Sequence, residues 1–184
     1  MSKKSFLKEF IRENKTVGSL TPSSRFLASK MLERVDYNQI KVIVELGPGT
    51  GVFTKKIVKQ LPENVFFLVF ELNEEFYFQL KNEFNQPNVI IIHDSADQIL
   101  KYLKAYNLES ADIVISSLPL ANFDESLRFS ILSKVYETLH DEGKFIQFQY
   151  SLQSKKVLNT LFKEVKIGFT AFNIPPAFVY TCVK

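Results

Sequence analysis

The chain has 184 residues, of which 46% are hydrophobic, and no Gly/Ser-rich or Pro-rich linker divides it, so we expect one domain with a substantial core. A formal net charge of +3 is too small to indicate nucleic-acid binding by itself, and a lone cysteine, Cys182, excludes an internal disulfide and a thiolate metal cluster. The same lone cysteine makes the cytoplasm the expected compartment, and no metal is expected. No stretch has the length of an uncharged membrane span, and the N-terminus lacks the apolar run of a signal peptide.

The N-terminal segment carries the excess positive charge. Residues 1–41 hold nine Lys/Arg and four Asp/Glu. Four apolar residues between Phe6 and Ile11 recur at helical spacing among lysines and an arginine, which predicts a basic amphipathic helix over Ser2 to Lys15. Such a helix either packs across the domain or lies on an anionic membrane surface, and the pattern fits both interpretations. We expect residues 1–36 to form an N-terminal helical segment and residues 37–184 to form the core of a single domain.

A second helix is predicted to begin at the hydroxyl-rich sequence from Thr21 to Ser24. A hydroxyl cap with proline in the first turn precedes apolar residues at helical spacing from Phe26 to Val35. Such a start could also hold an anionic group, although capping alone accounts for it.

The sequence VIVELGPGTGVF, Val42 to Phe53, dominates the rest of the chain. It begins as a strand that is apolar on both faces and continues with Gly47, Gly49 and Gly51, which permit a tight turn close to a ligand. Apolar residues then follow at helical spacing, so the pattern predicts a strand-to-helix crossover with a nucleotide-type binding loop.

Two kinds of loop fit this pattern: the dinucleotide motif G-x-G-x-x-G, and the G-x-G-x-G of class I S-adenosylmethionine methyltransferases, which ELGPGTG resembles. Glu45 lies just before the loop, where it would repel a pyrophosphate but suits an ammonium or a water-bridged cationic group. We therefore favour S-adenosylmethionine as the cofactor over a dinucleotide, and over a ligand-free glycine-rich turn.

The second apolar strand, Val65 to Phe70, ends at Glu71. This acid follows Gly51 by twenty residues, close to the spacing of an acid that binds ribose hydroxyls in such folds. The alternative is an exposed acid that caps the next helix.

A third strand, Val89 to Ile92, ends in His93, Asp94 and Ser95. The resemblance implies that Asp94 accepts a hydrogen bond from the exocyclic amine of adenine, and that the next backbone amide donates to the ring. Asp94 as the cap of the following helix is a competing role, and the two can coexist.

The fourth strand, Ile113 to Ile115, leads into a loop that we expect to face the methyl group. Enzymes that methylate the amine of adenine have Asn or Asp here, then proline, then an aromatic ring on which the base stacks. This chain has Ser117 in place of the amide and Leu120 in place of the ring. A flat base is therefore a poor fit, whereas a small aliphatic amine needs no such platform.

The end of the chain predicts a fifth strand and a hairpin. A turn at Glu142 and Gly143 precedes a strand that ends near Tyr150, and two alternating stretches follow a further helix, Val165 to Ala171 and Phe178 to Val183. Five βα units and an antiparallel pair are the pattern of class I methyltransferases. The expected fold is α/β, a seven-stranded Rossmann-like sheet, mostly parallel, with an antiparallel C-terminal hairpin and helices on both faces.

A narrower resemblance rests on five blocks in one order: FLKEFIRENKTVGSLTPSSRFLASKM, ELGPGTGVFT, SSLPL, FIQFQYS and NIPPAFVY. They resemble bacterial phospholipid N-methyltransferases, which methylate phosphatidylethanolamine. The resemblance implies an enzyme associated peripherally with an anionic membrane surface through Lys3 to Lys15 and a phospholipid substrate. We expect no DNA as a partner, and we favour lipid over RNA. The expected catalytic residues, which hold the amine, are Tyr150, Ser117, Leu118 and Pro119. The expected cofactor-binding residues are Glu45, Gly47, Gly49, Thr50, Gly51, Glu71, Leu72, Asp94, Ser95, Ala96 and Ser116.

Three alternatives stay open at this point. The same core serves ribosomal RNA adenine and small-molecule methyltransferases, and a membrane-binding protein could retain the cofactor pocket without turnover. Tyr150 could also be no more than a strand-end aromatic packed over the cofactor cleft.

Overall fold

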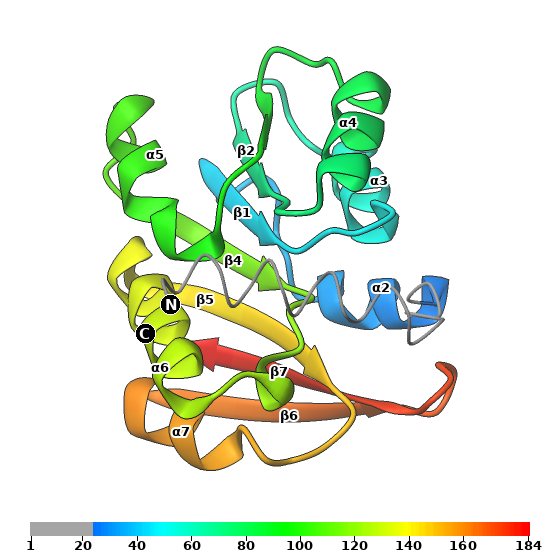
Figure 1. Ribbon diagram of the computed structural model, residues 1–184, viewed down its shortest axis with the longest axis vertical. Helices are drawn as coiled ribbons and strands as arrows, with labels where there is room; N and C mark the ends of the chain where they lie inside the picture. The colour runs from blue at the N-terminus through cyan, green and yellow to red at the C-terminus, as the bar shows by residue number, and fades with distance from the viewer. Residues whose placement is uncertain (1–23) are drawn as a thin grey trace.

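The computed structural model describes residues 24–184, so the predicted basic helix from Ser2 to Lys15 lies outside the described residues. Seven strands form one sheet in the order β3-β2-β1-β4-β5-β7-β6 (Figure 1). The strands are β1 (Val42–Leu46), β2 (Phe66–Phe70), β3 (Val89–Ile92), β4 (Ala111–Ser116), β5 (Leu139–Gln149), β6 (Glu164–Thr170) and β7 (Ala177–Val183).

The first five strands are parallel, whereas β7 runs antiparallel to both of its neighbours, β5 and β6. The predicted mixed sheet with an antiparallel C-terminal hairpin is therefore confirmed. Because β7 lies between β5 and β6, the strand that is later in sequence occupies the inner position.

Helices cover both faces of the sheet. The helical elements are α2 (Arg25–Leu32), α3 (Val52–Val58), α4 (Glu74–Glu83), the 3-10 turn η1 (Ala96–Gln98), α5 (Ile99–Ala105), the 3-10 turn η2 (Leu120–Asn122), α6 (Glu125–Thr138) and α7 (Lys155–Leu161). Strand side chains alternate between the faces: Ile43 packs with α2, α3 and α4, whereas Val44 and Leu46 pack with α5, α6 and α7. This alternation produces two cores, one on each face of β1.

Short polar side chains fix where several helices begin. The hydroxyl of Ser24 accepts a hydrogen bond from the backbone N–H of Leu27 and caps α2, while Asn73 and Asp124 cap α4 and α6 in the same way. The predicted hydroxyl cap is therefore confirmed at Ser24, whereas the predicted proline in the first turn is wrong, because α2 begins at Arg25. No helix within residues 24–184 is both long and apolar enough to span a bilayer.

One predicted boundary is wrong. The sequence indicated a turn at Glu142 and Gly143 before the fifth strand, but β5 begins at Leu139. The turn lies inside the strand as an irregularity, because Ala111 pairs with Leu139 whereas Ile113 pairs with Lys144. Glu142 is one of the extra residues of this bulge, and its φ is 66°.

Candidate active site

Four loops that follow parallel strands lie in a row at the carboxyl edge of the sheet. The backbone N–H of Gly47 donates to the carbonyl of Phe70 at 2.9 Å, and that of Ser117 donates to the carbonyl of Leu46 at 2.9 Å. The N–H of Glu71 donates to the carbonyl of Ile92 at 3.0 Å. The loops that carry the predicted cofactor residues are therefore neighbours, and ligands bind at this edge in open α/β sheets.

The three loop glycines serve two different purposes. All three have positive φ, and a Cβ atom would come within 2.7 Å of Leu118 Cδ2 if added to Gly47, and within 2.7 Å of Leu80 Cδ2 if added to Gly51. A Cβ atom on Gly49 would meet no other atom of residues 24–184 within 4 Å. The outer glycines thus permit close packing, whereas Gly49 faces open space, and its contact with the cofactor stays a prediction.

Glu45 lies fully buried beneath this loop. Its Oε2 accepts a hydrogen bond of 2.7 Å from the hydroxyl of Thr54, and its Oε1 has no hydrogen-bond partner within the described residues. Burial raises the pKa of Glu45 to about 8, opposed by the Thr54 hydrogen bond and assisted by the charge of Glu71. Glu45 is therefore a largely neutral acid at pH 7, with one oxygen still unused.

Glu71 ties the glycine loop to the end of β2. Its Oε2 accepts from the backbone N–H of Gly49 at 3.0 Å, and its Oε1 accepts from the N–H of Asn73 at 2.7 Å. Burial raises the pKa of the carboxyl, and these backbone hydrogen bonds oppose the rise. Because Glu71 is buried and Asn73 caps α4, Glu71 is not an exposed capping acid.

The residues after β3 also gather at this edge. Asp94 Oδ1 accepts from the backbone N–H of Ser95 at 2.8 Å, and Oδ2 accepts from the hydroxyl of Tyr102 at 3.2 Å and from Lys101 Nζ at 3.4 Å. Ser95 and Ala96 are buried. Asp94 does not cap α5, whose N-cap is Gln98, and its contact with adenine stays a prediction.

The loop after β4 presents unused hydrogen-bond acceptors. The buried hydroxyl oxygen of Ser117 has no hydrogen-bond partner within residues 24–184. On the adjacent strand, Gln147 Nε2 donates to the carbonyls of Leu118 at 3.0 Å and Phe148 at 2.6 Å, which leaves Gln147 Oε1 buried and without a partner in the same range. Ser116, which pairs with Gln147, accepts from the N–H of Leu118 at 3.2 Å.

Leu120 does not lie where the sequence comparison suggested. It is the first residue of η2 and is completely buried in the core under α6, and Phe123 is buried there as well. Leu120 therefore cannot take the place of a stacking ring. The loop from Ser116 to Phe123 exposes no aromatic ring. The cause is that the loop turns Leu120 and Phe123 into the core, so the identity of the residue at position 120 does not decide it.

Tyr150 follows β5 on the side of the glycine loop. Its ring meets Phe148 edge to face with centroids 5.7 Å apart, and Phe148 stacks on Phe53 at 6.0 Å. Tyr150 is about half exposed. It has the packing of a strand-end aromatic and the exposure that a substrate contact requires.

The remaining predicted residues take minor positions. Thr50 is exposed on the glycine loop, and Pro119 leads into η2. Leu72 is half-buried after β2, and its carbonyl contacts His93 Nε2 at 3.2 Å.

Sequence reasoning missed Thr54 and Gln147 as parts of the site. The available signal was that both are polar residues at positions where the pattern predicts a buried side chain.

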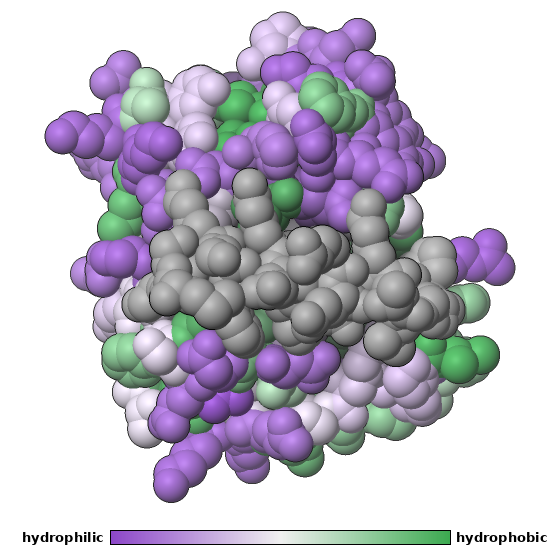
Figure 2. All heavy atoms as spheres, viewed as in Figure 1, coloured by the Kyte–Doolittle hydropathy of each residue, from purple (hydrophilic) through white to green (hydrophobic). Residues whose placement is uncertain are grey.

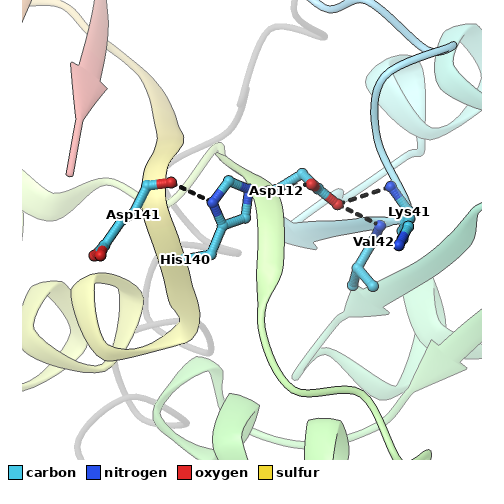
Figure 3. Close-up of polar contacts among 5 residues, drawn as sticks. All are labelled: Lys41, Val42, Asp112, His140 and Asp141. Carbon is cyan, nitrogen blue, oxygen red and sulfur yellow. Dashed lines mark hydrogen bonds and ion pairs between the residues drawn. The ribbon is translucent and has the colours of Figure 1, made fainter.

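Both histidines lie away from the loop after β4. His140 is at the amino edge, where its Nε2 contacts Asp112 Oδ1 at 3.1 Å and its Nδ1 contacts the main-chain oxygen of Asp141 (Figure 3). His93 stacks on Tyr77 with centroids 4.8 Å apart. The described residues also contain no group of three or more His, Cys, Asp or Glu side chains suited to a metal ion.

The sheet order, the glycine loop, the acid near the end of β1 and the acids that follow β2 and β3 define a class I S-adenosylmethionine-dependent methyltransferase. Residues 8–168 match the O-methyltransferase domain family, and the chain belongs to that family. The fit of the cofactor rests on the open space at Gly49 and on the unused oxygen of Glu45.

Three known proteins illustrate the relationship. The chain is 29% identical over 179 residues to an ornithine lipid N-methyltransferase of Singulisphaera acidiphila, covering 96% of this chain and 93% of the relative. It is 25% identical over 183 residues to ribosomal RNA small subunit methyltransferase A of Ureaplasma parvum serovar 3, covering 93% of this chain and 61% of that one. A solved precorrin-6y C5,15-methyltransferase from Geobacter metallireducens superposes with a TM-score of 0.69 at 15% identity, covering 90% of this chain and 92% of that one, and shows the fold alone.

Proposed function

We propose that the protein transfers the methyl group of S-adenosylmethionine to the primary amine of a membrane lipid headgroup, at the membrane surface. Phosphatidylethanolamine and ornithine lipids both carry such an amine. The first is the substrate that the sequence blocks favour, and the second is named by the relative from Singulisphaera acidiphila. The shared chemistry is an alkyl amine held at the surface of a bilayer.

The observation that carries this proposal is the pair of unused acceptors near the loop after β4. The Ser117 hydroxyl oxygen and Gln147 Oε1 are buried and lack partners within the described part of the chain. An amine donates hydrogen bonds, so these acceptors would orient it while its lone pair points at the methyl group. The half-exposed Tyr150 offers a further oxygen from the end of β5.

Nitrogen is favoured over oxygen as the acceptor of the methyl group. A hydroxyl group needs a strong base before it can attack, and both histidines lie away from this loop. An alkyl ammonium has an unperturbed pKa of about 10.4, and desolvation beside a cationic group lowers it, so loss of the proton to solvent is sufficient.

The cofactor supplies an activated methyl group on a cationic sulfur. Among this chain's residues, we assign Glu71 to the ribose hydroxyls, Glu45 to the cofactor ammonium, and Asp94 with Ser95 to adenine. The backbone of the glycine loop approaches the cofactor at Gly49, where the space is open. No covalent intermediate with the protein is needed.

The test uses cofactor labelled in its methyl group and vesicles of three compositions. We expect methylated lipid from vesicles that contain phosphatidylethanolamine or ornithine lipid, and none from phosphatidylglycerol alone, which has no amine. Mass spectrometry of the extracted lipids identifies the headgroup and the number of methyl groups added. Cofactor binding without methylation of either amine lipid would contradict the proposal, and methylation of added ribosomal RNA instead would favour the nucleic-acid alternative.

A further inference from the structure

Three apolar side chains project into solvent where α2 begins and where the loop from β6 to β7 turns. Phe172 is 72% exposed, Ile174 is 80% exposed and Phe26 is 49% exposed. The rings of Phe26 and Phe172 lie 5.4 Å apart, and the guanidinium of Arg25 lies 5.3 Å from the centre of the Phe26 ring. We call Phe26, Phe172 and Ile174 the apolar tip. Exposed contiguous apolar side chains of this kind mark an interaction site.

The apolar tip is held in place by a buried amide. Asn173 lies between its two most exposed members, and its Oδ1 accepts from the backbone N–H of Ser24 at 2.9 Å while its Nδ2 donates to the carbonyl of Pro175 at 2.8 Å. The hydroxyl of Ser24 donates to the carbonyl of Phe172 at 2.7 Å. The neighbours of Asn173 are therefore directed outward by a satisfied hydrogen-bond network.

Strand register places the apolar tip at the same edge of the sheet as the active site. Thr170 pairs with Ala177 and Gln149 pairs with Phe178, so the β6–β7 loop lies beside the end of β5. In Figure 1 this loop is beside the start of α2, and Figure 2 shows hydrophobic side chains, in green, gathered at the same margin of the molecule. A surface that contacts the apolar tip therefore also lies beside the end of β5, which Tyr150 follows.

Charge at this part of the edge is positive. The loops of residues 150–154 and 171–176 contain no Asp or Glu, whereas Arg25 is exposed next to Phe26, and Lys155 and Lys156 are exposed where the first loop enters α7. Residues 1–23, which join the described chain at Ser24, contain five Lys/Arg and two Asp/Glu. A partner that suits exposed apolar groups next to a cation, at an edge without nearby loop acids, is an anionic lipid bilayer.

We propose that the apolar tip inserts into the interfacial region of an anionic phospholipid bilayer and turns the carboxyl edge of the sheet toward the membrane. The proposal rests on the proposed function only in that this orientation would bring a lipid amine to the site. Ile174, the most exposed member, is aliphatic and offers no face for a base to stack on, which favours a bilayer over RNA.

The chain contains no tryptophan, so one introduced residue reports its own surroundings. Phe172→Trp places the reporter on the apolar tip, and Tyr106→Trp places a matched control at the opposite edge, where Tyr106 is 41% exposed. With vesicles of phosphatidylethanolamine and phosphatidylglycerol, we expect emission of Phe172→Trp to shift to shorter wavelength and to be quenched by lipids brominated in their acyl chains. Emission of the control should not move. An unmoved Phe172→Trp, or one that responds to RNA and not to vesicles, overturns the proposal.

A second pair of measurements separates this proposal from the proposed function. The double variant Phe172→Ser, Ile174→Ser should float with vesicles at least about tenfold more weakly than the wild type, since two exposed apolar side chains lose their burial in lipid. Its melting temperature and its cofactor affinity should not change, because neither side chain is buried in the protein. If the wild type methylates lipid but the double variant binds vesicles as strongly as the wild type, the insertion proposal is wrong and the proposed function stands. If Phe172→Trp inserts into vesicles but no lipid is methylated, the insertion proposal stands and the proposed function is wrong.

Discussion

At the scale of single residues, Glu45 carries the clearest electrostatic consequence. Its pKa of about 8 means that the folded protein keeps a proton that the unfolded chain releases near the ordinary value of 4.5. Between these pH values the native state binds more protons than the unfolded state. Glu45 therefore makes the free energy of unfolding fall as pH rises from about 4.5 to about 8, and it causes no further change above that range. A cation placed against the unused oxygen of Glu45 would instead favour the ionised form of its carboxyl.

If the cofactor ammonium lies against Glu45, as we propose, it favours the ionised form of this carboxyl. We therefore predict that cofactor affinity rises with pH up to about 8 and that binding at pH 7 releases a proton. Calorimetry in buffers of different ionisation enthalpy measures the proton count. Glu45→Gln should abolish the pH dependence and weaken binding by about 1.5 to 3 kcal/mol, the usual range for a hydrogen bond to a charged group. Proton release that is unchanged in Glu45→Gln would show that another group titrates.

Gly49 gives a second prediction. Its φ of 55° strains any side chain, so Gly49→Ala and Gly49→Val should both lose stability by roughly 1 to 2 kcal/mol. They differ in bulk, because only valine fills the open space above the loop. We expect cofactor binding to survive in Gly49→Ala and to disappear in Gly49→Val, as measured by calorimetry on variants whose circular dichroism matches the wild type. Wild-type affinity in Gly49→Val would mean that the cofactor binds elsewhere.

At the scale of elements, Asp112 fastens the amino end of β1. Its Oδ2 accepts from the backbone N–H groups of Lys41 and Val42, both at 2.8 Å, and its Oδ1 meets His140 (Figure 3). We predict that Asp112→Ala lowers the free energy of unfolding by about 1 to 3 kcal/mol, because these donors lose their acceptor. Urea denaturation measures the change.

Asp141→Ala is the control for this cluster. Asp141 contacts His140 through its main-chain oxygen, so loss of its side chain should change stability by no more than about 0.5 kcal/mol. Cofactor affinity should stay the same in both variants, because the cluster lies at the edge opposite the site. A weakened cofactor in Asp112→Ala would indicate that the two edges are coupled.

The elements also show what a sequence can predict. The strand Val89–Ile92 was predicted with its observed bounds, because strands buried on both faces are continuous apolar runs. The start of β5 was wrong, since its irregular pairing brings polar residues into the strand. The burial of Leu120 depends on the turn η2, and the contacts of Gln147 depend on which strand lies beside β5. Neither fact is encoded in local spacing.

At the scale of the whole molecule, Cys182 can report on global opening. It is buried in β7, and burial raises the pKa of its thiol to about 12, so the native protein should resist thiol reagents at pH 8. Because it is the single cysteine, labelling should follow unfolding. Cofactor at 100 times its dissociation constant should slow labelling about a hundredfold, equivalent to about 2.7 kcal/mol.

Mass spectrometry of the alkylated protein measures this rate. Tyr180→Phe is a useful comparison, because loss of the hydrogen bond from its hydroxyl to the carbonyl of Ser151 should speed labelling without exposing Cys182 directly. Rapid labelling of the folded wild type would contradict the buried position of the thiol.

The inner position of β7 also bears on how the chain is made. A ribosome delivers β6 before β7, yet β6 has no partner in the sheet until β7 has paired with β5. A nascent or truncated chain that stops short of Ala177 would therefore leave the edge of β5 unpaired, and open edges of this kind promote association with other chains. Fragments ending before β7 should thus depend on chaperones in a way that the finished protein does not.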